Sequence, residues 1–317
     1  GVSIREEGED IFLEAKEARA EKLVLKEISV TATENLLMFA TSLHGETEIR
    51  LAAQEPHVQD LCRFLMASGV FIEGGGTHTI RIQGNERMKG VEHRIVSDYL
   101  EIGTMAIAAA ATEGDVTIRD VHVHDLDALW QKLREAGVII DLGEQSVRVR
   151  GVKQLNTISK LDTGIFPKFP SDLQAPFMVL MTKASGVSKV FETLFEGRLN
   201  YLFELEKMGA RFEFLNPHQA IIIGPTPLRG ASIASCDIRA GAAMIIAALM
   251  AEGVTEITSI NYIDRGYERL DEKLQSLGAH IIRSQSDEDL NQIQRSLSSL
   301  SLAPKSGELE PSLEVQF

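Results

Sequence analysis

The sequence repeats itself with a period of about 70 residues, which is the feature that most restricts the possible folds. Segments of the form Leu-x-x-x-Gly end at Gly69, Gly137, Gly209 and Gly278, and Gly1 fits the same register. A second set of glycines, Gly45, Gly114, Gly186 and Gly253, runs in phase with the first. A fixed period of this length indicates one supersecondary unit used several times. The sequence therefore predicts four whole units, and residues 1–18 are interpreted as the end of another.

Each unit has the same predicted internal order, βαβαββ. A short strand precedes a first helix made of small and apolar residues, predicted at 33–43, 100–111, 173–184 and 240–251. We expect the glycine of the second set to end this helix as a C-terminal cap. A strand and an amphipathic second helix follow, and two short strands close the unit. The first helices should be buried on all sides, and the second helices should keep one wet face.

Bulk composition excludes several function classes. Acidic residues outnumber basic ones, 46 to 32, for a net charge of −14, which argues against general nucleic-acid binding. The two cysteines, Cys62 and Cys236, are too few for a disulfide framework, so a reducing, cytoplasmic location is expected. The sequence predicts neither a membrane span nor a signal peptide, and its start inside a repeat suggests a piece of a longer protein. Residues 284–317 are Ser-rich and acidic, so we expect a loose, disordered tail.

Several segments carry a family resemblance. In order along the chain they are Ser29-Val-Thr-Ala-Thr-Glu-Asn35, Ala53-Gln-Glu-Pro-His-Val58, Phe169-Pro-Ser-Asp-Leu-Gln-Ala, Glu192-Thr-Leu-Phe-Glu-Gly-Arg198, Cys236-Asp-Ile-Arg-Ala240 and Ile263-Asp-Arg-Gly-Tyr-Glu268. Together they resemble the signature segments of the UDP-N-acetylglucosamine 1-carboxyvinyltransferases, a family of enolpyruvyl transferases. The resemblance implies an α/β (α+β) fold of six repeated βαβαββ units, arranged as two inside-out α/β barrel domains with a substrate cleft between them.

The resemblance also implies a domain division and substrates. Residues 1–97 would be part of the first domain and residues 98–283 the complete second domain of three units. The partners would be phosphoenolpyruvate and UDP-N-acetylglucosamine, with no cofactor and no metal. The enolpyruvyl group would pass to the sugar 3′-hydroxyl and phosphate would leave, in the first committed step of peptidoglycan precursor synthesis. A missing N-terminal region would carry a cysteine loop, a lysine and an arginine that complete the site, so this chain alone is expected to be inactive.

Three aspartates, Asp98, Asp172 and Asp237, stand where first helices are predicted to begin. Aspartate is a leading N-cap residue, so capping is the simplest interpretation of each one. A cap can also face a substrate site. By resemblance, Asp172 is the catalytic base, Asp237 a second catalytic carboxylate, and Asp98 a substrate-binding residue at the junction of the two domains.

The arginine candidates are Arg198, Arg239 and Arg265. Arg239 is predicted at a helix start, where a cation opposes the helix dipole, and this unfavourable position is a hint of function. The simplest interpretation of Arg265 is a surface ion pair with Asp264, and that of Arg198 is a solvated charge. The resemblance instead makes both Arg239 and Arg265 ligands of phosphoenolpyruvate, and it counts Arg239 among the catalytic residues. It also assigns substrate binding to Arg198, Glu196, Leu194, Ser29, Val30 and Thr31.

Some positions depart from the family pattern. Glu27 replaces a lysine that would meet the diphosphate, Thr31 replaces a glycine, Tyr99 an arginine, and Phe166 a histidine or tyrosine. Two other functions therefore stay open: an enolpyruvyl transferase for another acceptor, such as shikimate 3-phosphate or a different nucleotide, and a non-catalytic protein that binds a nucleotide sugar.

Three further features have simpler interpretations. Val121-His-Val-His-Asp125 lacks an evident third ligand for a metal and is interpreted as a solvated strand end. Gly74-Gly-Gly-Thr77 is predicted to be a hairpin turn rather than a phosphate-binding loop. Cys236 is predicted to be a small buried residue rather than a nucleophile.

Overall fold

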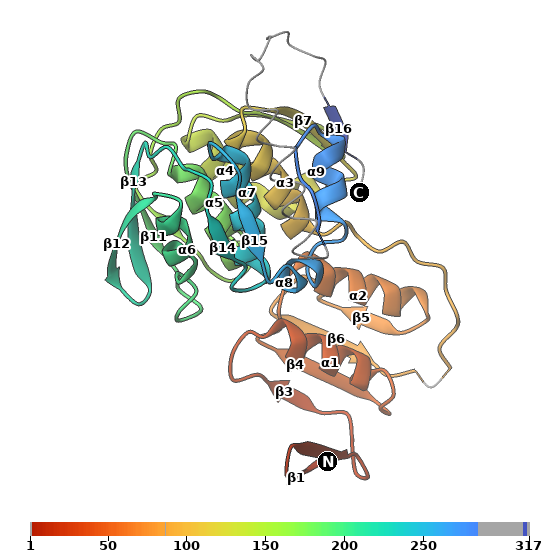
Figure 1. The fold of residues 1–317 in the computed structure, drawn as a ribbon. Helices are drawn as coiled ribbons and strands as arrows, with labels where there is room; N and C mark the ends of the chain where they lie inside the picture. Colours follow the sequence, from red (N-terminus) through yellow and green to blue (C-terminus); the bar gives the residue numbers. More distant parts are fainter. Residues whose placement is uncertain (1, 86, 285–312, 316–317) are drawn as a thin grey trace. The chain divides into compact units, whose positions relative to one another are not determined.

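A computed structural model describes residues 2–85, 87–284 and 313–315 (Figure 1). The chain forms two compact units. The first, called unit 1 here, comprises Gly1–Tyr99 and Gly164–Lys168. The second, unit 2, comprises Leu100–Thr163 and Phe169–Phe317. Among the described residues, no helix is both long enough and apolar enough to cross a membrane.

Unit 1 contains one complete repeat after an exposed hairpin. The hairpin pairs β1 (Ser3–Glu7) with β2 (Asp10–Glu14). The repeat then runs β3 (Lys22–Val24), α1 (Val30–Ala40), β4 (Glu46–Arg50), α2 (Pro56–Ala67), β5 (Phe71–Glu73) and β6 (Thr79–Gln83). The sheet order is β3-β4-β6-β5, with β3 parallel to β4 and the other pairs antiparallel. The first helix thus crosses between two parallel strands, and the closing hairpin inserts its second strand beside β4.

Unit 2 repeats this topology. Its second repeat runs β10 (Leu161–Asp162), the 3₁₀ helix η2 (Ser171–Leu173), α5 (Gln174–Met181), β11 (Gly186–Phe191), α6 (Tyr201–Lys207), β12 (Arg211–Asn216) and β13 (Gln219–Gly224). The sheet order is β10-β11-β13-β12, again first, second, fourth, third. The βαβαββ order predicted from the glycine period is therefore confirmed in both units.

The other two repeats of unit 2 depart from this order: one has no strand directly before its first helix, and among the described residues the other lacks both closing strands. The complete βαβαββ order, predicted for four repeats, is therefore formed in sequence order by two of them. One runs α3 (Tyr99–Ala111), β7 (Asp115–Arg119), η1 (Val123–Leu126), α4 (Asp127–Glu135), β8 (Ile139–Leu142) and β9 (Ser146–Arg150). The place of its first strand is taken by β16 (Leu313–Val315), which pairs in parallel with β7. The other repeat runs β14 (Ser232–Ala234), α7 (Ile238–Met250), β15 (Glu256–Thr258), α8 (Asn261–Asp264) and α9 (Leu270–Ser276). Most of the predicted tail, 285–312 and 316–317, lies outside the described residues.

The Leu-x-x-x-Gly glycines are equivalent in all four repeats. Gly69, Gly137, Gly209 and Gly278 each follow the C-cap residue of a second helix and have φ angles of 101°, 93°, 95° and 92°. The next residue donates its backbone N–H to the carbonyl of the leucine in the motif, at 2.9 to 3.1 Å. This is the Schellman arrangement, which satisfies carbonyls at a helix end and needs a left-handed residue. The strongest sequence signal of the repeat is therefore a helix stop.

The second set of glycines does not cap helices, so that prediction is wrong. Gly45, Gly114 and Gly253 lie three to five residues beyond the ends of α1, α3 and α7, before the next strand, and Gly186, five residues beyond α5, is the first residue of β11. Beyond α3, Glu113 rather than Gly114 takes the left-handed conformation, with a φ of 59°. These glycines do recur at equivalent places in the repeat, but they lie beyond the helix ends and not at the C-terminal caps.

The first helices of unit 2 form its centre, and α1 of unit 1 differs from them. Every residue of α3 and of α5 is buried, and α5 packs against α7 (Figure 1). A Cβ atom at Gly103 of α3 would lie 2.4 Å from Leu173, so the helices approach too closely there for a side chain. By contrast, α1 exposes Met38 and Phe39, so the prediction of all-round burial is wrong for this helix. The second helices keep one wet face, as predicted.

Candidate functional site

Asp237 caps the start of α7. Its carboxylate accepts hydrogen bonds from the backbone N–H groups of Arg239, at 2.9 Å, and Ala240, at 2.8 Å. Its backbone is extended, as an N-cap residue requires. The capping interpretation of Asp237 is confirmed. A fixed negative charge therefore lies at the positive end of a 13-residue helix.

Asp172 is not a cap. It lies within η2, and neither η2 nor α5 has a side-chain cap hydrogen bond. Its carboxylate instead contacts two arginines from other repeats or segments: Oδ1 lies 2.8 Å from Nη2 of Arg198, and Oδ2 lies 3.7 Å from Nε of Arg239. The side chain of Asp172 is 30% exposed, so the carboxylate is held by cations yet open to solvent. The interpretation of Asp172 as an N-cap is therefore wrong.

Arg198 is anchored on three sides. Its second nitrogen, Nη1, donates to the Ser171 hydroxyl at 2.7 Å while Nη2 meets Asp172. The guanidinium also lies over the Phe195 ring, 4.4 Å from its centroid, in a cation–π contact. A solvated surface charge has none of these contacts, so that interpretation of Arg198 is wrong.

The neighbours of Arg198 point elsewhere. Glu196 is 84% exposed and lies 3.7 Å from the His218 ring, so the pairing partner of Arg198 is Asp172 and not Glu196. Leu194 is also exposed. The resemblance assigned both residues to substrate binding, and that assignment stays a prediction.

Arg239 turns back from the α7 start toward Asp172. Besides the contact with Asp172, its guanidinium lies 5.3 Å from the centroid of the Tyr267 ring. Its side chain is 18% exposed. A cation at the first turn of a helix is unfavourable on its own, and here the Asp172 carboxylate and the aromatic face offset this cost.

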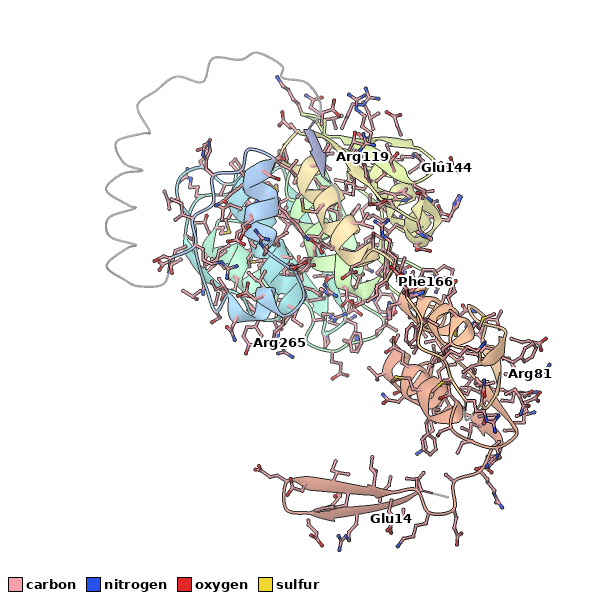
Figure 2. The ribbon with its side chains drawn as sticks, turned by 90° about the vertical axis from the view of Figure 1, so that its right-hand side faces the viewer. Glu14, Arg81, Arg119, Glu144, Phe166 and Arg265 are labelled. Carbon is pink, nitrogen blue, oxygen red and sulfur yellow. The ribbon has the colours of Figure 1, made fainter. Side chains whose placement is uncertain are left out.

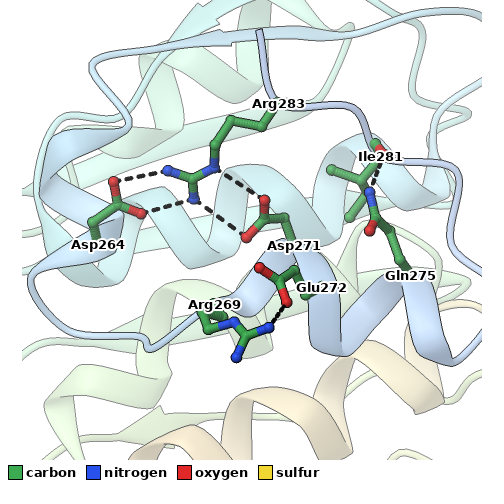
Figure 3. A network of polar contacts seen from close by, with 7 residues as sticks. All are labelled: Asp264, Arg269, Asp271, Glu272, Gln275, Ile281 and Arg283. Atoms are coloured by element: carbon green, nitrogen blue, oxygen red, sulfur yellow. Dashed lines mark hydrogen bonds and ion pairs between the residues drawn. The ribbon is translucent and has the colours of Figure 1, made fainter. Parts of the chain in front are cut away.

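Arg265 follows α8 and is exposed on the surface of unit 2 (Figure 2). The predicted pair with Asp264 is not formed, because Asp264 pairs with Arg283 instead (Figure 3). Nη2 of Arg283 lies 2.8 Å from Asp264, and its Nε lies 3.0 Å from Asp271. Among the described residues, no ion pair holds the Arg265 side chain itself.

The backbone around Arg265 lies beside the start of α7. A Cβ atom at Gly266 would lie 2.2 Å from Ile238 and 3.6 Å from Nη1 of Arg239. A glycine next to Arg265 thus allows the segment between α8 and α9 to approach the start of α7 within the same repeat. Arg198 and Arg239 both contact Asp172. Asp237 is two residues before Arg239 in the sequence, and Arg265 is next to Gly266, which lies beside the start of α7. That these residues line one cleft stays a prediction.

A buried polar layer lies beneath this cluster, and sequence reasoning did not find it. Glu192 is 0% exposed and accepts a hydrogen bond from the Ser171 hydroxyl at 2.6 Å. Gln174, also 0% exposed, donates to the Tyr201 hydroxyl at 3.0 Å. Burial raises the pKa of Tyr201 well above its ordinary value, and the negative charges of Glu192 and Asp237 raise that pKa further. The available signal was the glutamate that directly follows β11 and begins one of the family-like segments.

The nucleotide-binding candidates of unit 1 lie at the start of α1. Ser29 is the N-cap and accepts from the Ala32 N–H at 3.3 Å, and Val30 and Thr31 begin the helix. Asp98 is the residue directly before α3. The start of α3 is within one residue of the predicted 100, whereas α1 begins three residues before the predicted 33. The substrate contacts of these residues stay predictions.

The structure also shows where three other sequence features lie. His122 and His124 lie at η1, where His124 is 86% exposed, and no group of three potential metal ligands is found among the described residues. The Gly74–Thr77 segment is the turn between β5 and β6, as predicted. Cys236 is exposed, so its predicted burial is wrong.

Chemically, the cluster offers a carboxylate between guanidinium groups. Asp172 can accept a proton from a hydroxyl, and the arginines can hold carboxylate and phosphate groups by charge-assisted hydrogen bonds. The α7 start adds backbone dipoles that favour anions. This combination suits reactions between an anionic substrate and an alcohol.

A family model described as EPSP synthase (3-phosphoshikimate 1-carboxyvinyltransferase) matches residues 1–274. A UDP-N-acetylglucosamine 1-carboxyvinyltransferase 2 of Geobacillus kaustophilus is 42% identical over 294 residues, which cover 92% of this chain and 68% of the relative. One of Bacillus subtilis is 40% identical over 298 residues, 93% of this chain and 69% of the relative. A UDP-N-acetylglucosamine 1-carboxyvinyltransferase 1 of Caldanaerobacter subterraneus is 44% identical over 272 residues, which cover 84% of this chain and 65% of the relative.

Solved structures agree on the fold. The enolpyruvyl transferase NikO of Streptomyces tendae is 25% identical with a TM-score of 0.81, covering 90% of this chain and 70% of that one. An EPSP synthase of Acinetobacter baumannii is 20% identical with a TM-score of 0.67, and the match covers 84% of this chain and 64% of that one. At this identity the likeness supports the fold and nothing more. The predicted fold class is confirmed. The chain spans about two thirds of the length of the relatives it matches.

Proposed function

Because the chain belongs to the UDP-N-acetylglucosamine 1-carboxyvinyltransferase family of enolpyruvyl transferases, we propose that it acts in that reaction. The enolpyruvyl group of phosphoenolpyruvate passes to the 3′-hydroxyl of UDP-N-acetylglucosamine, and phosphate leaves. The reaction supplies a peptidoglycan precursor. A new bond forms between the sugar oxygen and the carbon that carried the phosphate, the bond from that carbon to the phosphate oxygen breaks, and the hydroxyl proton goes to a base.

One observation carries the proposal: the Asp172 carboxylate lies 2.8 Å from Nη2 of Arg198 and 3.7 Å from Nε of Arg239, a residue of the first turn of α7. In the proposed reaction Asp172 accepts the hydroxyl proton. Arg239 and Arg265 hold the anionic groups of phosphoenolpyruvate. Asp237, fixed by the α7 backbone, is the second carboxylate of the site.

The remaining assignments belong to the same proposal. Arg198, Glu196, Leu194 and Asp98 contact the sugar nucleotide, as does the start of α1 at Ser29, Val30 and Thr31. The relatives have further sequence that this chain does not match, and we propose that an upstream region completes the anion site. A cytoplasmic location is proposed because both cysteines are free thiols.

The test is a phosphate-release assay with phosphoenolpyruvate and a panel of acceptors. It uses the 317-residue chain and the same chain extended by its upstream coding sequence. We expect phosphate release by the extended chain with UDP-N-acetylglucosamine, confirmed by the mass of the product, and no turnover by the chain alone. Loss of several positioned charged groups and of water exclusion explains the second result, because one such donor is worth about 10²–10³ in rate.

The other outcomes identify the alternatives. Release with shikimate 3-phosphate, the acceptor in the description of the family model, would assign the chain to a different acceptor. Binding of UDP-N-acetylglucosamine without turnover in any form would favour a non-catalytic protein. Either result would direct attention to Glu27 and Thr31, the two departures from the family pattern at the nucleotide segment.

A further inference from the structure

Glu192 is a fully buried carboxylate beneath the candidate site. It directly follows β11 and is 0% exposed. Its backbone is held by His218, whose carbonyl accepts from the Glu192 N–H at 2.8 Å. A buried glutamate costs free energy unless its oxygens accept hydrogen bonds, so its contacts should explain why the chain keeps it there.

The two carboxylate oxygens of Glu192 bind two different segments. Oε2 accepts from the Ser171 hydroxyl at 2.6 Å, in η2. Oε1 accepts from the backbone N–H groups of Leu194, at 3.0 Å, and Phe195, at 3.3 Å. One carboxylate thus joins the segment that carries Asp172 to the turn that leads to Arg198.

The Ser171 hydroxyl links Glu192 to Arg198 by hydrogen bonds. A hydroxyl has one proton to donate, and here it goes to Glu192, which leaves oxygen lone pairs for another donor. Nη1 of Arg198 fills that place at 2.7 Å, while Nη2 reaches Asp172 at 2.8 Å. The direction of every hydrogen bond in the chain from Glu192 to Asp172 is therefore determined.

Glu192 also fixes the other surface that Arg198 touches. The Phe195 ring lies under the guanidinium, and the Phe195 N–H is one of the donors to Glu192. Both contacts that orient Arg198, apart from Asp172 itself, therefore depend on the same buried carboxylate.

We propose that Glu192, acting through Ser171, is a positioning residue that aims Arg198 at Asp172. This inference rests on the proposed function for its catalytic consequence, but the geometry of Arg198 can be tested without turnover. The competing explanation is that Glu192 only satisfies buried N–H groups of its turn. In that case the loss of the Ser171 hydroxyl would lower stability without changing Arg198.

The central variants are Ser171→Ala, Ser171→Thr and Glu192→Gln. Ser171→Ala removes the bridge and leaves both backbone bonds of Glu192 in place. Ser171→Thr retains a hydroxyl. Glu192→Gln keeps the side-chain volume and one acceptor oxygen, but its amide nitrogen is a donor, so the Ser171 hydroxyl must accept from it and can no longer donate to it.

The matched control is Ser188→Ala. Ser188 is another buried serine of unit 2, 0% exposed, and it accepts from the Ile158 N–H at 3.2 Å. Among the described residues, its side chain makes no hydrogen bond with Glu192, Ser171 or Arg198. Its loss should therefore have a comparable cost in stability and no effect on the candidate site.

The first readout is the side-chain ¹⁵N–¹H signal of Arg198 in the 317-residue chain, assigned by its disappearance in Arg198→Lys. We expect it to shift or broaden in Ser171→Ala and Glu192→Gln, to return in Ser171→Thr, and to stay unchanged in Ser188→Ala. The second readout is kcat and KM in the form of the protein that releases phosphate. We expect kcat to fall about 10- to 100-fold in Ser171→Ala, the range for a lost hydrogen bond to a charged group.

An unmoved Arg198 signal in Ser171→Ala, or equal changes in Ser188→Ala, would overturn the positioning role. If no form of the protein releases phosphate, the proposed function fails, and the Arg198 signal still decides the structural part of the inference. The two failures are therefore distinguishable.

Discussion

Nη2 of Arg198 lies 2.8 Å from Oδ1 of Asp172, although Asp172 lies in η2 and Arg198 in the turn between β11 and α6 of the same repeat. Both were candidates from the sequence, but the pattern gave no reason to join them. The pair links the proposed base to a buried network, because Nη1 of the same guanidinium is bound to Ser171. The proposed chemistry and the packing of unit 2 therefore depend on the same side chain.

Replacing the guanidinium of Arg198, whose two terminal nitrogens make the contacts, by the single amine of lysine should weaken catalysis without unfolding the protein. A lysine cannot hold Ser171 and Asp172 through two planar nitrogens at once. We expect Arg198→Lys to lower kcat/KM about tenfold or more. Steady-state kinetics of the upstream-extended chain check this, with Arg150→Lys as the control, since Arg150 pairs with Asp141 on the surface of the same unit. Equal losses in the two variants would show that the guanidinium at residue 198 has no special role.

The turn that carries Arg265 depends on Arg283. Arg283 binds Asp264 and Asp271 together, and these contacts lower the pKa of both carboxyls (Figure 3). Because a lysine cannot reproduce this arrangement, Arg283→Lys should lower the free energy of unfolding by about 1 kcal/mol. Urea unfolding measures the change. Unaltered stability would mean that solvent replaces the network without cost.

Glu48 should make the stability of unit 1 depend on pH. Its carboxylate lies within 3.3 Å of Arg50, Arg81 and Lys22, and hydrogen bonds from Arg50 and Arg81 lower its pKa from 4.5 to about 2. A lowered folded-state pKa gives stability that is present above the unfolded value and lost as the pH falls from 4.5 toward 2.

The measurement is urea unfolding of wild type and Glu48→Gln at several pH values. We expect wild type to be more stable near neutral pH and the difference to shrink between pH 4.5 and 2. Glu46→Gln on the same strand, which leaves the contacts of Glu48 intact, serves as control. A difference that stays constant over this range would contradict the assignment.

The helix-stop glycines should resist substitution because of their backbone angle and not because of crowding. At Gly209, φ is 95° and the nearest atom to an added Cβ is the Pro227 oxygen at 3.8 Å. Gly209→Ala should therefore lower the free energy of unfolding by about 1 kcal/mol, the cost of a left-handed backbone for a residue with a Cβ. Gly90→Ala is the control, since Gly90 has neither a positive φ nor a neighbour within 4 Å. Thermal or urea unfolding that ranks the two variants equally would refute the backbone explanation.

The sequence predicted the features that depend on local spacing. The period of the glycines gave the repeat, the strand and helix order, and the helix stops at residues such as Gly137. The aspartate before α7 was correctly interpreted as a cap, because capping needs only neighbouring N–H groups. The family segments led to the correct fold class.

Features that depend on contacts between distant segments were not predictable from one sequence. Asp172 has the residue type and position of a cap, yet its partners come from α7 and from the turn after β11. Glu192 begins a family-like segment, but its complete burial was not predictable, because burial is a property of the packed unit. The exposure of Met38 and Phe39 likewise depends on what packs against α1, which its apolar composition cannot specify.

The most direct test of the account is phosphate release from phosphoenolpyruvate in the presence of UDP-N-acetylglucosamine, compared between wild type, Asp172→Asn and Asp141→Asn in the upstream-extended chain. Asp141 pairs with Arg150 on the surface of unit 2, so its variant removes a carboxylate of the same kind away from the candidate site. We predict that Asp172→Asn lowers kcat by about 10²–10⁴, the usual contribution of a general base, and that Asp141→Asn keeps the wild-type rate. A folded Asp172→Asn variant that releases phosphate at the wild-type rate would contradict the central claim.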